Sequence, residues 1–269
     1  MTRSTPSPVI ALMRRYVTDY INRHDFSVMP EFMADDYSLR TGGTSISGRD
    51  GTYRDAVAKQ LEQFPGLVFT LHEIYQSGSL VAVRFTEHGA SERHGGRLAA
   101  WPSIGIYKVR DGVLAGCCIE QDYFSRRRQL ESGKPVTVDP PATAPWDGSD
   151  HPSNPAAEDC VRSWLVSSTF VDSDRVQIDD SRATGTVERI ADQASLEVVE
   201  IMSAGSHVAF HAVQKGHLAD DFAQDLSIQR GTPITMYLSG LVEVRDNVIL
   251  NGNIIRDRWG LYRRLAKKA

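Results

Sequence analysis

The chain has 269 residues, 41% of them hydrophobic and 24% charged, with a formal net charge of −4 at pH 7. This length and apolar content suffice for two cores of roughly 130 residues each. The nearly balanced charge excludes a strongly basic, nucleic-acid-binding surface. The apolar runs are shorter than the roughly 20 residues that span a bilayer, and the first residues lack the apolar segment of a signal peptide. We expect a cytoplasmic protein that binds neither nucleic acid nor membrane.

The cysteine and histidine content predicts neither disulfides nor a metal site. Three cysteines cannot form a disulfide framework, and they and the eight histidines lack the spacings of known metal sites. The glycine patterns of dinucleotide-binding and phosphate-binding loops are absent from the sequence as well. We therefore expect no metal and no cofactor.

Hydrophobic periodicity predicts helices first and strands afterwards. The apolar residues within 9–24 recur at helical spacing, and further helices are expected at 27–34 and 51–63, with an extended segment before the third helix. Strands are predicted at 68–75, 80–88, 97–110 and 113–123. This order predicts an α+β fold, in which N-terminal helices pack on a curved antiparallel sheet and leave a small-molecule pocket between the two layers.

A repeat divides the chain. Residues 105–130 recur 135 residues later as 240–265, with nine identical positions and no gap. The sequence between the copies contains a proline-rich stretch, which is typical of an extended linker. We predict a domain at 9–133, a linker at 134–154, and a second, degenerate domain of the same cone shape at 155–269 that lacks the third helix.

Three patterns occur together with this order of elements. They are ADD-x-x-L at 34–39, R-F-T-x-H at 84–88, and D-G-x-L followed by Q-D-x-x-x-R-x-x-Q-L at 121–130. In this combination the chain resembles the SnoaL-like branch of the nuclear transport factor 2-like superfamily. The resemblance implies cone-shaped domains that pair through their sheets, so that a tandem chain would form a pseudo-dimer internally; further homo-oligomerisation is left open. It also implies cofactor-free proton transfer in an apolar cavity.

Ionisable residues in such a cavity are the candidates for acid or base, because burial shifts their pKa toward 7. We select Asp122, Glu120, His88 and His72. Asp122 recurs as Asp257, each just before a helix, so a helix N-cap is the alternative role. Glu120 shares a strand face with Asp122, which would make a carboxylate pair; a solvent-exposed glutamate is the alternative.

Strand alternation predicts where the histidine candidates point. In the strand at 80–88 the apolar side chains should face the helices, so Arg84 and His88 are expected on the open sheet face or between the domains. In the preceding strand, His72 shares its predicted face with Ile74, which would place its imidazole at the cavity.

Substrate contacts are assigned to one arginine and to several aromatic residues. We expect Tyr20, Tyr53 and Arg84 to donate hydrogen bonds to a developing oxyanion, and Tyr16 and Trp101 to line the pocket. For aromatic residues at helical spacing, packing in the core is the alternative.

The predicted function is that of a cofactor-independent acid–base enzyme acting on a hydrophobic, aromatic or polycyclic small molecule. It would be a lyase or isomerase, such as an aldol-type polyketide cyclase, a dehydratase or an isomerase. The steroid isomerases carry their base after the ADD segment, where this chain has Arg40, Thr41 and Gly42, so a steroid isomerase is disfavoured. The alternative is a non-catalytic module of the same fold that binds a small ligand or a protein.

Overall fold

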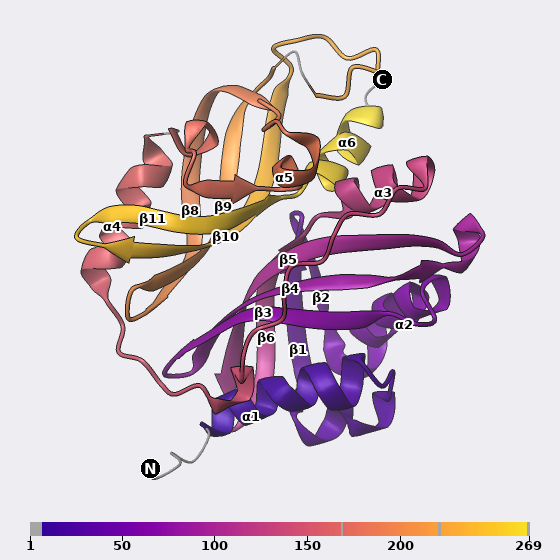
Figure 1. The fold of residues 1–269 in the computed structure, drawn as a ribbon, viewed down its shortest axis with the longest axis vertical. Helices are drawn as coiled ribbons and strands as arrows, with labels where there is room; N and C mark the ends of the chain where they lie inside the picture. Colours follow the sequence, from indigo (N-terminus) through magenta and orange to yellow (C-terminus); the bar gives the residue numbers. More distant parts are fainter. Residues whose placement is uncertain (1–6, 168, 220–221, 268–269) are drawn as a thin grey trace.

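Two separate β-sheets, each with its own helices, make up the protein (Figure 1). A computed structural model describes residues 7–167, 169–219 and 222–267. The strand orders are β2-β1-β6-β5-β4-β3 and β7-β11-β10-β9-β8. The expectation of an α+β fold with two cone-shaped units is confirmed. Below, residues 8–132 are called the first half and residues 155–266 the second half.

Both sheets are mixed, which corrects the expectation of antiparallel sheets. β1 (Met33–Thr41) runs parallel to β6 (Val113–Gln121), and β7 (Val176–Ile178) runs parallel to β11 (Val248–Arg256), whereas the other neighbouring strands are antiparallel. β1 and β7 each precede the antiparallel strands of their own half and lie beside the last of them, β6 and β11 respectively. Only such a long connection allows parallel pairing, because a short hairpin joins antiparallel strands.

The first half places most of its helical segments before the meander. Its helical segments are α1 (Pro8–Arg14), the π-helical η1 (Arg15–Ile21), η2 (Phe26–Glu31), η3 (Gly48–Tyr53), α2 (Arg54–Gln63), η4 (Glu92–His94) and α3 (Tyr123–Ser132). Its remaining strands are β2 (Thr44–Ser47), β3 (Val68–Ser77), β4 (Leu80–Ser91) and β5 (Arg97–Arg110). The helix predicted at 9–24 is thus α1 continued by η1, and η2 ends before the expected residue 34 because β1 begins at Met33.

The second half has fewer helical residues before its meander. Its elements besides β7 and β11 are α4 (Pro155–Val166), η6 (Thr169–Asp172), α5 (Ser181–Thr184), β8 (Ala191–Ala204), β9 (His207–Leu218), β10 (Pro233–Arg245) and α6 (Arg258–Ala266). Only the short α5 lies between β7 and β8, where the first half has η3 and α2 between β1 and β3. The matching strand orders fit a two-domain repeat whose second copy has lost the third helix.

The segment between the halves runs along the edge of the first sheet. Its only regular element is η5 (Pro145–Asp147). The amide of Ala142 donates to the carbonyl of Leu71 at 2.8 Å, and the amide of His151 donates to the carbonyl of Gln76 at 3.0 Å. The segment therefore satisfies polar groups of β3 that an open sheet edge would leave unpaired.

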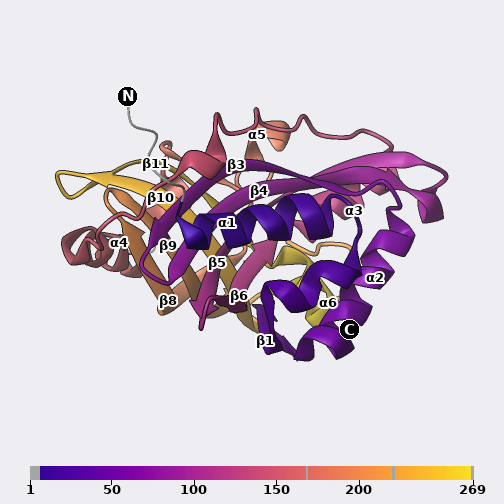
Figure 2. The same cartoon turned by 90° about the horizontal axis from the view of Figure 1, so that it is seen from below.

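The helices of the first half cover only one face of its sheet. In Figure 2, α1 lies across the strands, and in Figure 1 α1 and α2 lie on the side away from the second half. The side chains of Val81, Val83 and Phe85 in β4 belong to the core on this side. The predicted alternation of β4 is therefore confirmed, and Arg84 points to the other face.

The other faces of the two sheets pack against each other. Ile104 and Ile106 of β5 share one buried apolar cluster with Leu241 of β10 and Ile255 of β11. At the rim of this contact the ring of Tyr75 stacks on His207 of β9, with 3.8 Å between the centroids. Burial of these apolar side chains favours association of the two sheets.

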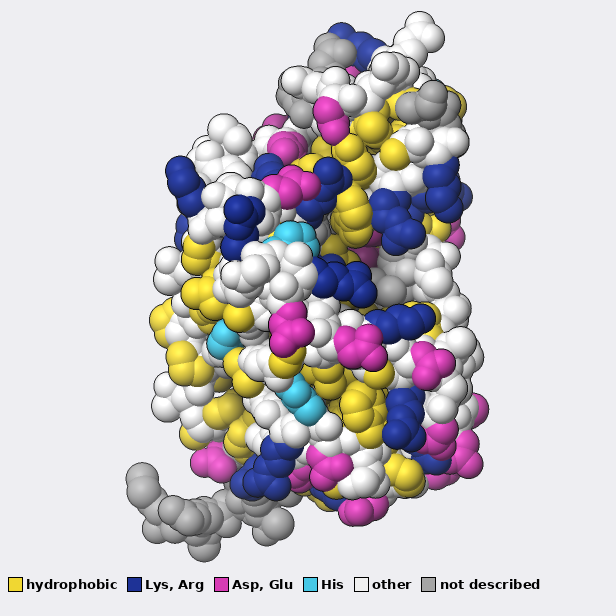
Figure 3. Space-filling model, turned by 90° about the vertical axis from the view of Figure 1, so that its right-hand side faces the viewer, with side chains coloured by type: hydrophobic (Ala, Val, Ile, Leu, Met, Phe, Trp, Pro, Cys, Tyr) yellow, Lys and Arg dark blue, Asp and Glu magenta, His cyan; other side chains and the backbone are white. Residues whose placement is uncertain are grey.

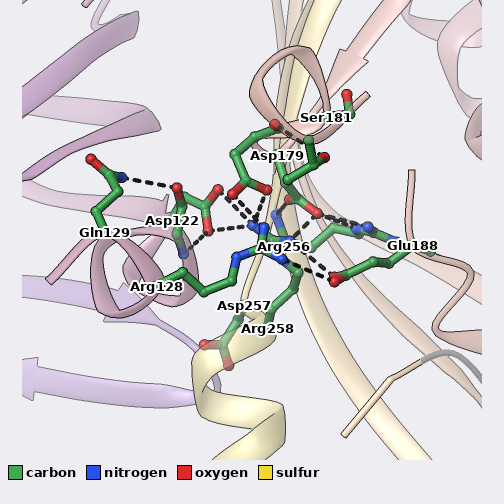
Figure 4. A network of polar contacts seen from close by, with 12 residues as sticks. Asp122, Arg128, Gln129, Asp179, Ser181, Glu188, Arg256, Asp257 and Arg258 are labelled. Carbon is green, nitrogen blue, oxygen red and sulfur yellow. Dashed lines mark hydrogen bonds and ion pairs between the residues drawn. The ribbon is translucent and has the colours of Figure 1, made fainter. Parts of the chain in front are cut away.

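An ion-pair network joins the halves where α3 and α6 begin (Figure 4). Arg258, only 2% exposed, donates hydrogen bonds of 2.8 Å to both carboxylate oxygens of Asp122. Its guanidinium also lies 2.8 Å from Asp180, 3.2 Å from Asp179 and 3.0 Å from Glu188. Asp122 belongs to the first half and the other four residues to the second, so the contact crosses between the halves.

Two more arginines complete this network. Arg256 donates to Asp179 at 2.8 Å, and Arg128 of α3 contacts Asp180 and lies 3.2 Å from Glu188. Burial raises the pKa of Asp122 to about 6 against the opposing effect of the Arg258 charge. Asp122 is therefore ionised at pH 7, and the network pairs buried charges of opposite sign.

Charged side chains of both signs are interspersed on the face that Figure 3 shows. Lys and Arg side chains gather across the middle of that face. Within the described part of the chain, none of the helices has the length and apolarity needed to cross a membrane.

Replacement of Arg258 by Met should destabilise the protein by roughly 3–5 kcal/mol, because Asp122 would stay buried without its cation. Urea-induced unfolding at pH 7 measures this loss. The matched control is Arg245→Met: Arg245 is exposed and pairs with Glu243 at the surface, so we expect less than about 1 kcal/mol. Equal effects of the two substitutions would contradict a stabilising role for the network.

Candidate active site

A cavity of about 160 Å³ lies between the helices and the sheet of the first half. We call it the cone cavity. Its wall is mainly apolar, with a few polar side chains. It is lined by Tyr16, Ile21, Leu39, Thr41, Ile46, Tyr53, Ala56, Val57, Gln60, Leu67, Phe69, Phe85, Glu87, Ile119, Gln121 and Tyr123.

Glu87 is the one carboxylate among the residues that line the cone cavity. It lies on β4, two residues after Phe85, so both side chains point from the same face of the strand toward the helices. Its side chain is buried, with 2% exposed. A charged group in such a place needs partners, because burial without hydrogen bonds costs several kcal/mol.

Three side chains donate hydrogen bonds to Glu87. The amide of Gln60 on α2 donates to Oε1 at 2.7 Å. The indole of Trp101, directly opposite on β5, donates to Oε2 at 2.5 Å, and the amide of Gln121 on β6 donates to the same oxygen. Residues from three different elements thus hold the carboxylate at the end of the cavity.

Burial raises the pKa of Glu87 to about 7, from an ordinary value of 4.5. The hydrogen bonds from Gln60, Trp101 and Gln121 and the charge of Arg126 oppose this rise, because they favour the ionised form. Desolvation is the larger effect. Glu87 therefore exists in both protonation states near neutral pH, as a group that accepts and returns protons requires.

Arg126 supplies positive charge behind this carboxylate without touching it. Its guanidinium lies over the rings of Trp101, at 4.9 Å, and Tyr123, at 4.3 Å. Tyr123 begins α3, and its hydroxyl donates to the side-chain oxygen of Gln121 and lies 3.4 Å from that of Gln60. The polar end of the cavity is therefore one connected network around Glu87.

A pair of tyrosines supplies hydroxyl groups to the cavity. The hydroxyls of Tyr16, from η1, and Tyr53, from η3, lie 3.3 Å apart. Burial raises the pKa of both tyrosines well above 10, so they stay protonated and act as donors. The adjacent Tyr20 is fully buried, and its hydroxyl finds no hydrogen-bond partner among the described residues.

The predicted substrate-binding residues divide between the two faces of the sheet. Tyr16 and Tyr53 line the cone cavity, Trp101 holds Glu87, and Tyr20 packs edge-on against Tyr16. Arg84 lies on the opposite face, where it pairs with Glu73 and with Asp139 of the connecting segment. The structure therefore brings four of the five together and separates Arg84 from them.

The two predicted acidic residues lie at the contact between the halves, outside the cone cavity. Asp122 caps α3 through a 3.1 Å bond from the Ser125 amide and pairs with Arg258. Glu120 is buried, which excludes the solvent-exposed alternative, and it accepts a bond of 3.0 Å from the Gly42 amide. Burial and the nearby Asp257 raise the pKa of Glu120. The expected pair with Asp122 is not formed, since Asp257 is the neighbouring carboxylate.

The two predicted histidines lie on the face of the first sheet that is opposite the helices, called the outer face below. His88 Nε2 is 2.8 Å from the hydroxyl of Thr70, and His72 Nε2 is 2.8 Å from the hydroxyl of Thr86. The placement of His72 beside Ile74 was wrong: a β-bulge between Leu71 and Glu73 reverses the alternation, so Ile74 faces the core and His72 does not. The catalytic roles of His72, His88, Glu120 and Asp122 stay predictions.

The sequence analysis missed Glu87, although one signal could have identified it. The alternation that assigns Val83 and Phe85 to the helix-covered face assigns Glu87 to that face too. A carboxylate in register with buried apolar residues is rare unless it is paired or functional.

The corresponding positions of the second half carry different side chains. Gln214 is opposite Met236 in β9 and β10, as Glu87 is opposite Trp101 in β4 and β5. A separate cavity of about 230 Å³ in the second half is lined by Gln214 and Arg256, among others. At this position a neutral amide replaces the carboxylate of Glu87, and the carboxylate that lines this second cavity is that of Asp172, from η6.

No group of three or more His, Cys, Asp and Glu side chains is arranged to hold a metal ion within the described ranges. Other hollows lie at the contact between the halves and on the surface of the second half.

Residues 13–116 match the model of the SnoaL-like domain family. This range contains η1, α2, Tyr16, Tyr53 and Glu87, whereas Tyr123 lies outside it. The matched part of the first half is therefore similar to a SnoaL-like domain. No curated protein matches the chain.

Solved structures with a similar fold each cover about half of this chain. A provisionally named SnoaL-like polyketide cyclase from Jannaschia sp. CCS1 is 16% identical over 49% of this chain and 98% of its own, with a TM-score of 0.42. IdmH from Streptomyces antibioticus, provisionally named a polyketide cyclase, is 23% identical over 46% and 99%, with a TM-score of 0.41. TsrD from Streptomyces laurentii is 24% identical over 46% and 94%, with a TM-score of 0.40.

The raised pKa of Glu87 predicts a pH-dependent stability. The folded state binds the proton more tightly than the unfolded state, so the free energy of unfolding should fall as pH rises from 4.5 through about 7. Relative to Glu87→Gln, which cannot ionise, the wild type should lose about 3 kcal/mol between pH 4.5 and pH 8. Urea unfolding at both pH values measures this difference. Glu62→Gln, an exposed site on α2, should follow the wild type, and parallel behaviour of all three proteins would refute the assigned shift.

Proposed function

We propose that the cone cavity is the active site of a cofactor-independent acid–base enzyme and that Glu87 is its proton-transferring group. The observation that carries this proposal is a buried carboxyl whose pKa is raised to about 7 and which lines an otherwise mainly apolar cavity. A base of this pKa is close to optimal at neutral pH. Perturbed groups of this kind concentrate at functional sites.

The geometry leaves one oxygen of Glu87 accessible to a proton. Oε2 accepts hydrogen bonds from Trp101 and Gln121, whereas Oε1 accepts one from Gln60. Each carboxylate oxygen has two lone pairs. Oε1 therefore keeps one for a proton removed from a carbon next to a substrate carbonyl.

The tyrosine pair would stabilise the charge that this proton removal creates. The electrons of the broken C–H bond move toward the carbonyl oxygen, and the hydroxyls of Tyr16 and Tyr53 are donors within the same apolar enclosure. Hydrogen bonds to a developing oxyanion are stronger where water is excluded. Aldol-type C–C bond formation or cleavage, dehydration and isomerisation all pass through such an enolate, so the site is compatible with each of them.

The lining favours a hydrophobic substrate with a planar ring. The rings of Phe69 and Phe85 stack on each other, 4.4 Å apart and 17° from parallel, and both line the cone cavity. Flat aromatic walls suit aromatic or polycyclic molecules. We propose a polyketide-like or phenolic substrate on this basis.

We further propose that residues 9–133 and 155–269 are two domains of a tandem repeat and that the second domain is a degenerate copy without this activity. Gln214 in place of Glu87 supports this, because an amide cannot take up the proton. The protein would act in the cytoplasm, as the sequence predicts.

The second candidate function is binding without catalysis. One observation favours it: the three donors to Glu87 already satisfy the carboxylate, as in a buried acid that serves packing alone. Thermal stabilisation by a library of phenolic, steroid and polyketide-like compounds finds ligands, and mass spectrometry on each hit separates the two functions. A hit that is chemically altered indicates an enzyme; hits that are all recovered unaltered indicate a binding module.

For any converted hit, Glu87→Gln should lower kcat/KM by roughly 10²–10⁴-fold, the usual contribution of a general base. In the wild type, kcat/KM should rise with pH and level off above about 7, because only the ionised carboxylate accepts a proton. Steady-state kinetics from pH 5 to 9 test both. The control Glu62→Gln should keep the rate and the pH profile of the wild type. Full activity of Glu87→Gln would contradict the role of Glu87 as the base.

His88→Ala separates this proposal from the earlier choice of base. His88 lies on the outer sheet face beside Thr70, away from the cone cavity, so its removal should change kcat/KM less than about 3-fold. The same kinetic assay measures it. If His88→Ala abolishes turnover while Glu87→Gln does not, the base is on the outer face and the cone cavity is not the active site.

A further inference from the structure

A hollow of about 470 Å³ lies where the first half meets α6 of the second half. We call it the junction hollow. The first half contributes the turn between β1 and β2 together with Tyr123, and the second half contributes residues of β10 and α6. It is lined by Thr41, Gly42, Gly43, Thr44, Tyr123, Thr235, Tyr237, Asp257, Trp259, Gly260, Arg263, Arg264 and Lys267.

The junction hollow carries an excess of positive charge, all of it from the second half. Arg263, Arg264 and Lys267 line it against one carboxylate, that of Asp257. Arg264 is engaged, because it donates to Asp257 at 3.2 Å and to the carbonyl of Thr235 at 2.9 Å. Arg263 and Lys267 are exposed and make no hydrogen bond or ion pair with the residues that the structure describes.

The repeat shows which ion pair Arg263 does not form among the described residues. Arg263 is 135 residues after Arg128, which pairs with Asp180 and Glu188 in the ion-pair network. Register shows what faces Arg263 instead. In the first sheet Arg40 is opposite Cys118, and in the second sheet Gln177 is opposite Asn253. Cys118 and Asn253 are 135 residues apart, so they correspond in the repeat. Arg40 therefore corresponds to Gln177.

Two and three residues after these positions, the first half has Gly42 and Gly43 where the second half has Asp179 and Asp180. One junction between the halves therefore has acidic side chains at these two positions, whereas the related junction has glycines there. A Cβ on Gly43 would lie 2.5 Å from the ring of Tyr237, so this turn is packed directly against the second half. Among the described residues, no carboxylate therefore stands beside Arg263 as Asp180 stands beside Arg128.

The junction hollow adjoins the cone cavity. Thr41 and Tyr123 line both, and the Tyr123 hydroxyl bonds to Gln121 within the Glu87 network. The cone cavity alone, at about 160 Å³, is smaller than the roughly 300–1,000 Å³ of typical small-molecule sites. A ligand of ordinary size with its ring in the cone cavity would therefore extend past Tyr123 into the hollow.

We propose that the junction hollow binds a carboxylate of the ligand whose ring occupies the cone cavity, with Arg263 and Lys267 as its partners. The substrate class is then an aromatic or polycyclic carboxylic acid. The carboxylate of the ligand pairs with Arg263 as the carboxylate of Asp180 pairs with Arg128 at the related junction. This inference rests on the proposed function of the cone cavity, and it gives the second half a role in recognition by the first.

Two matched probes test the proposal: 2-naphthoate and its neutral analogue 2-naphthamide, titrated into the full chain by calorimetry at low salt. Wild type should bind 2-naphthoate roughly 3–10-fold more tightly than 2-naphthamide, as expected for a pair of partly exposed ionic contacts. The double variant Arg263→Gln/Lys267→Gln should lose this preference and keep its affinity for 2-naphthamide. Arg93→Gln, an exposed arginine of η4, should keep the preference.

The outcomes separate this proposal from the proposed function. A preference that survives in the double variant, or equal affinities in the wild type, overturns the carboxylate site and leaves a Glu87-dependent activity untouched. Failure of both probes to bind contradicts the aromatic ligand class and the carboxylate site together. The Glu87→Gln variant should retain the preference for 2-naphthoate, since binding at the hollow does not require proton transfer, and its loss there would contradict the separation of the two sites.

Discussion

The buried pairing of Asp122 with Arg258 determines how the two halves meet, and the candidate site depends on it (Figure 4). Asp122 also caps α3, so one carboxylate fixes both the start of that helix and its position against the second half. The next residue, Tyr123, reaches the Glu87 network through Gln121. Breaking this buried ion pair is costly, so Asp122 and the adjacent Tyr123 are held in place. The second half therefore restrains the polar end of the cone cavity, although none of its residues lines that cavity.

The two junctions between the halves differ in their charged side chains although the strand orders of the two sheets match. At one junction, acidic residues follow β7 and meet three arginines, so charge is neutralised within the chain. At the other, Gly42 and Gly43 follow β1, and Arg263 forms no ion pair with the residues that the structure describes. Glycines in place of acidic side chains leave room at this junction, and we propose that a ligand carboxylate binds there.

Glu87 illustrates the conflict between stability and function in the first half. A carboxyl whose pKa is raised by burial lowers the stability of the folded state at neutral pH, and an amide would avoid this cost. The second half has that amide at Gln214. An energetically unfavourable residue in only one of two related cavities is expected where chemistry, and not packing, determines which residue is kept.

The sequence by itself determined the order of the elements, the alternation in β4 and the alternative role of Asp122 as a helix cap, because these depend on residues a few positions apart. The same alternation puts Glu87 on the helix-covered face of β4, but no prediction was made for it, because alternation cannot show whether a side chain on that face borders a cavity. Only the tertiary structure decided that Asp122 meets Arg258, 136 residues away, that Glu120 faces Asp257, and that a bulge turns His72 outward. Burial, charge pairing and pKa arise from contacts between segments far apart in the chain, and a local pattern carries no information about them.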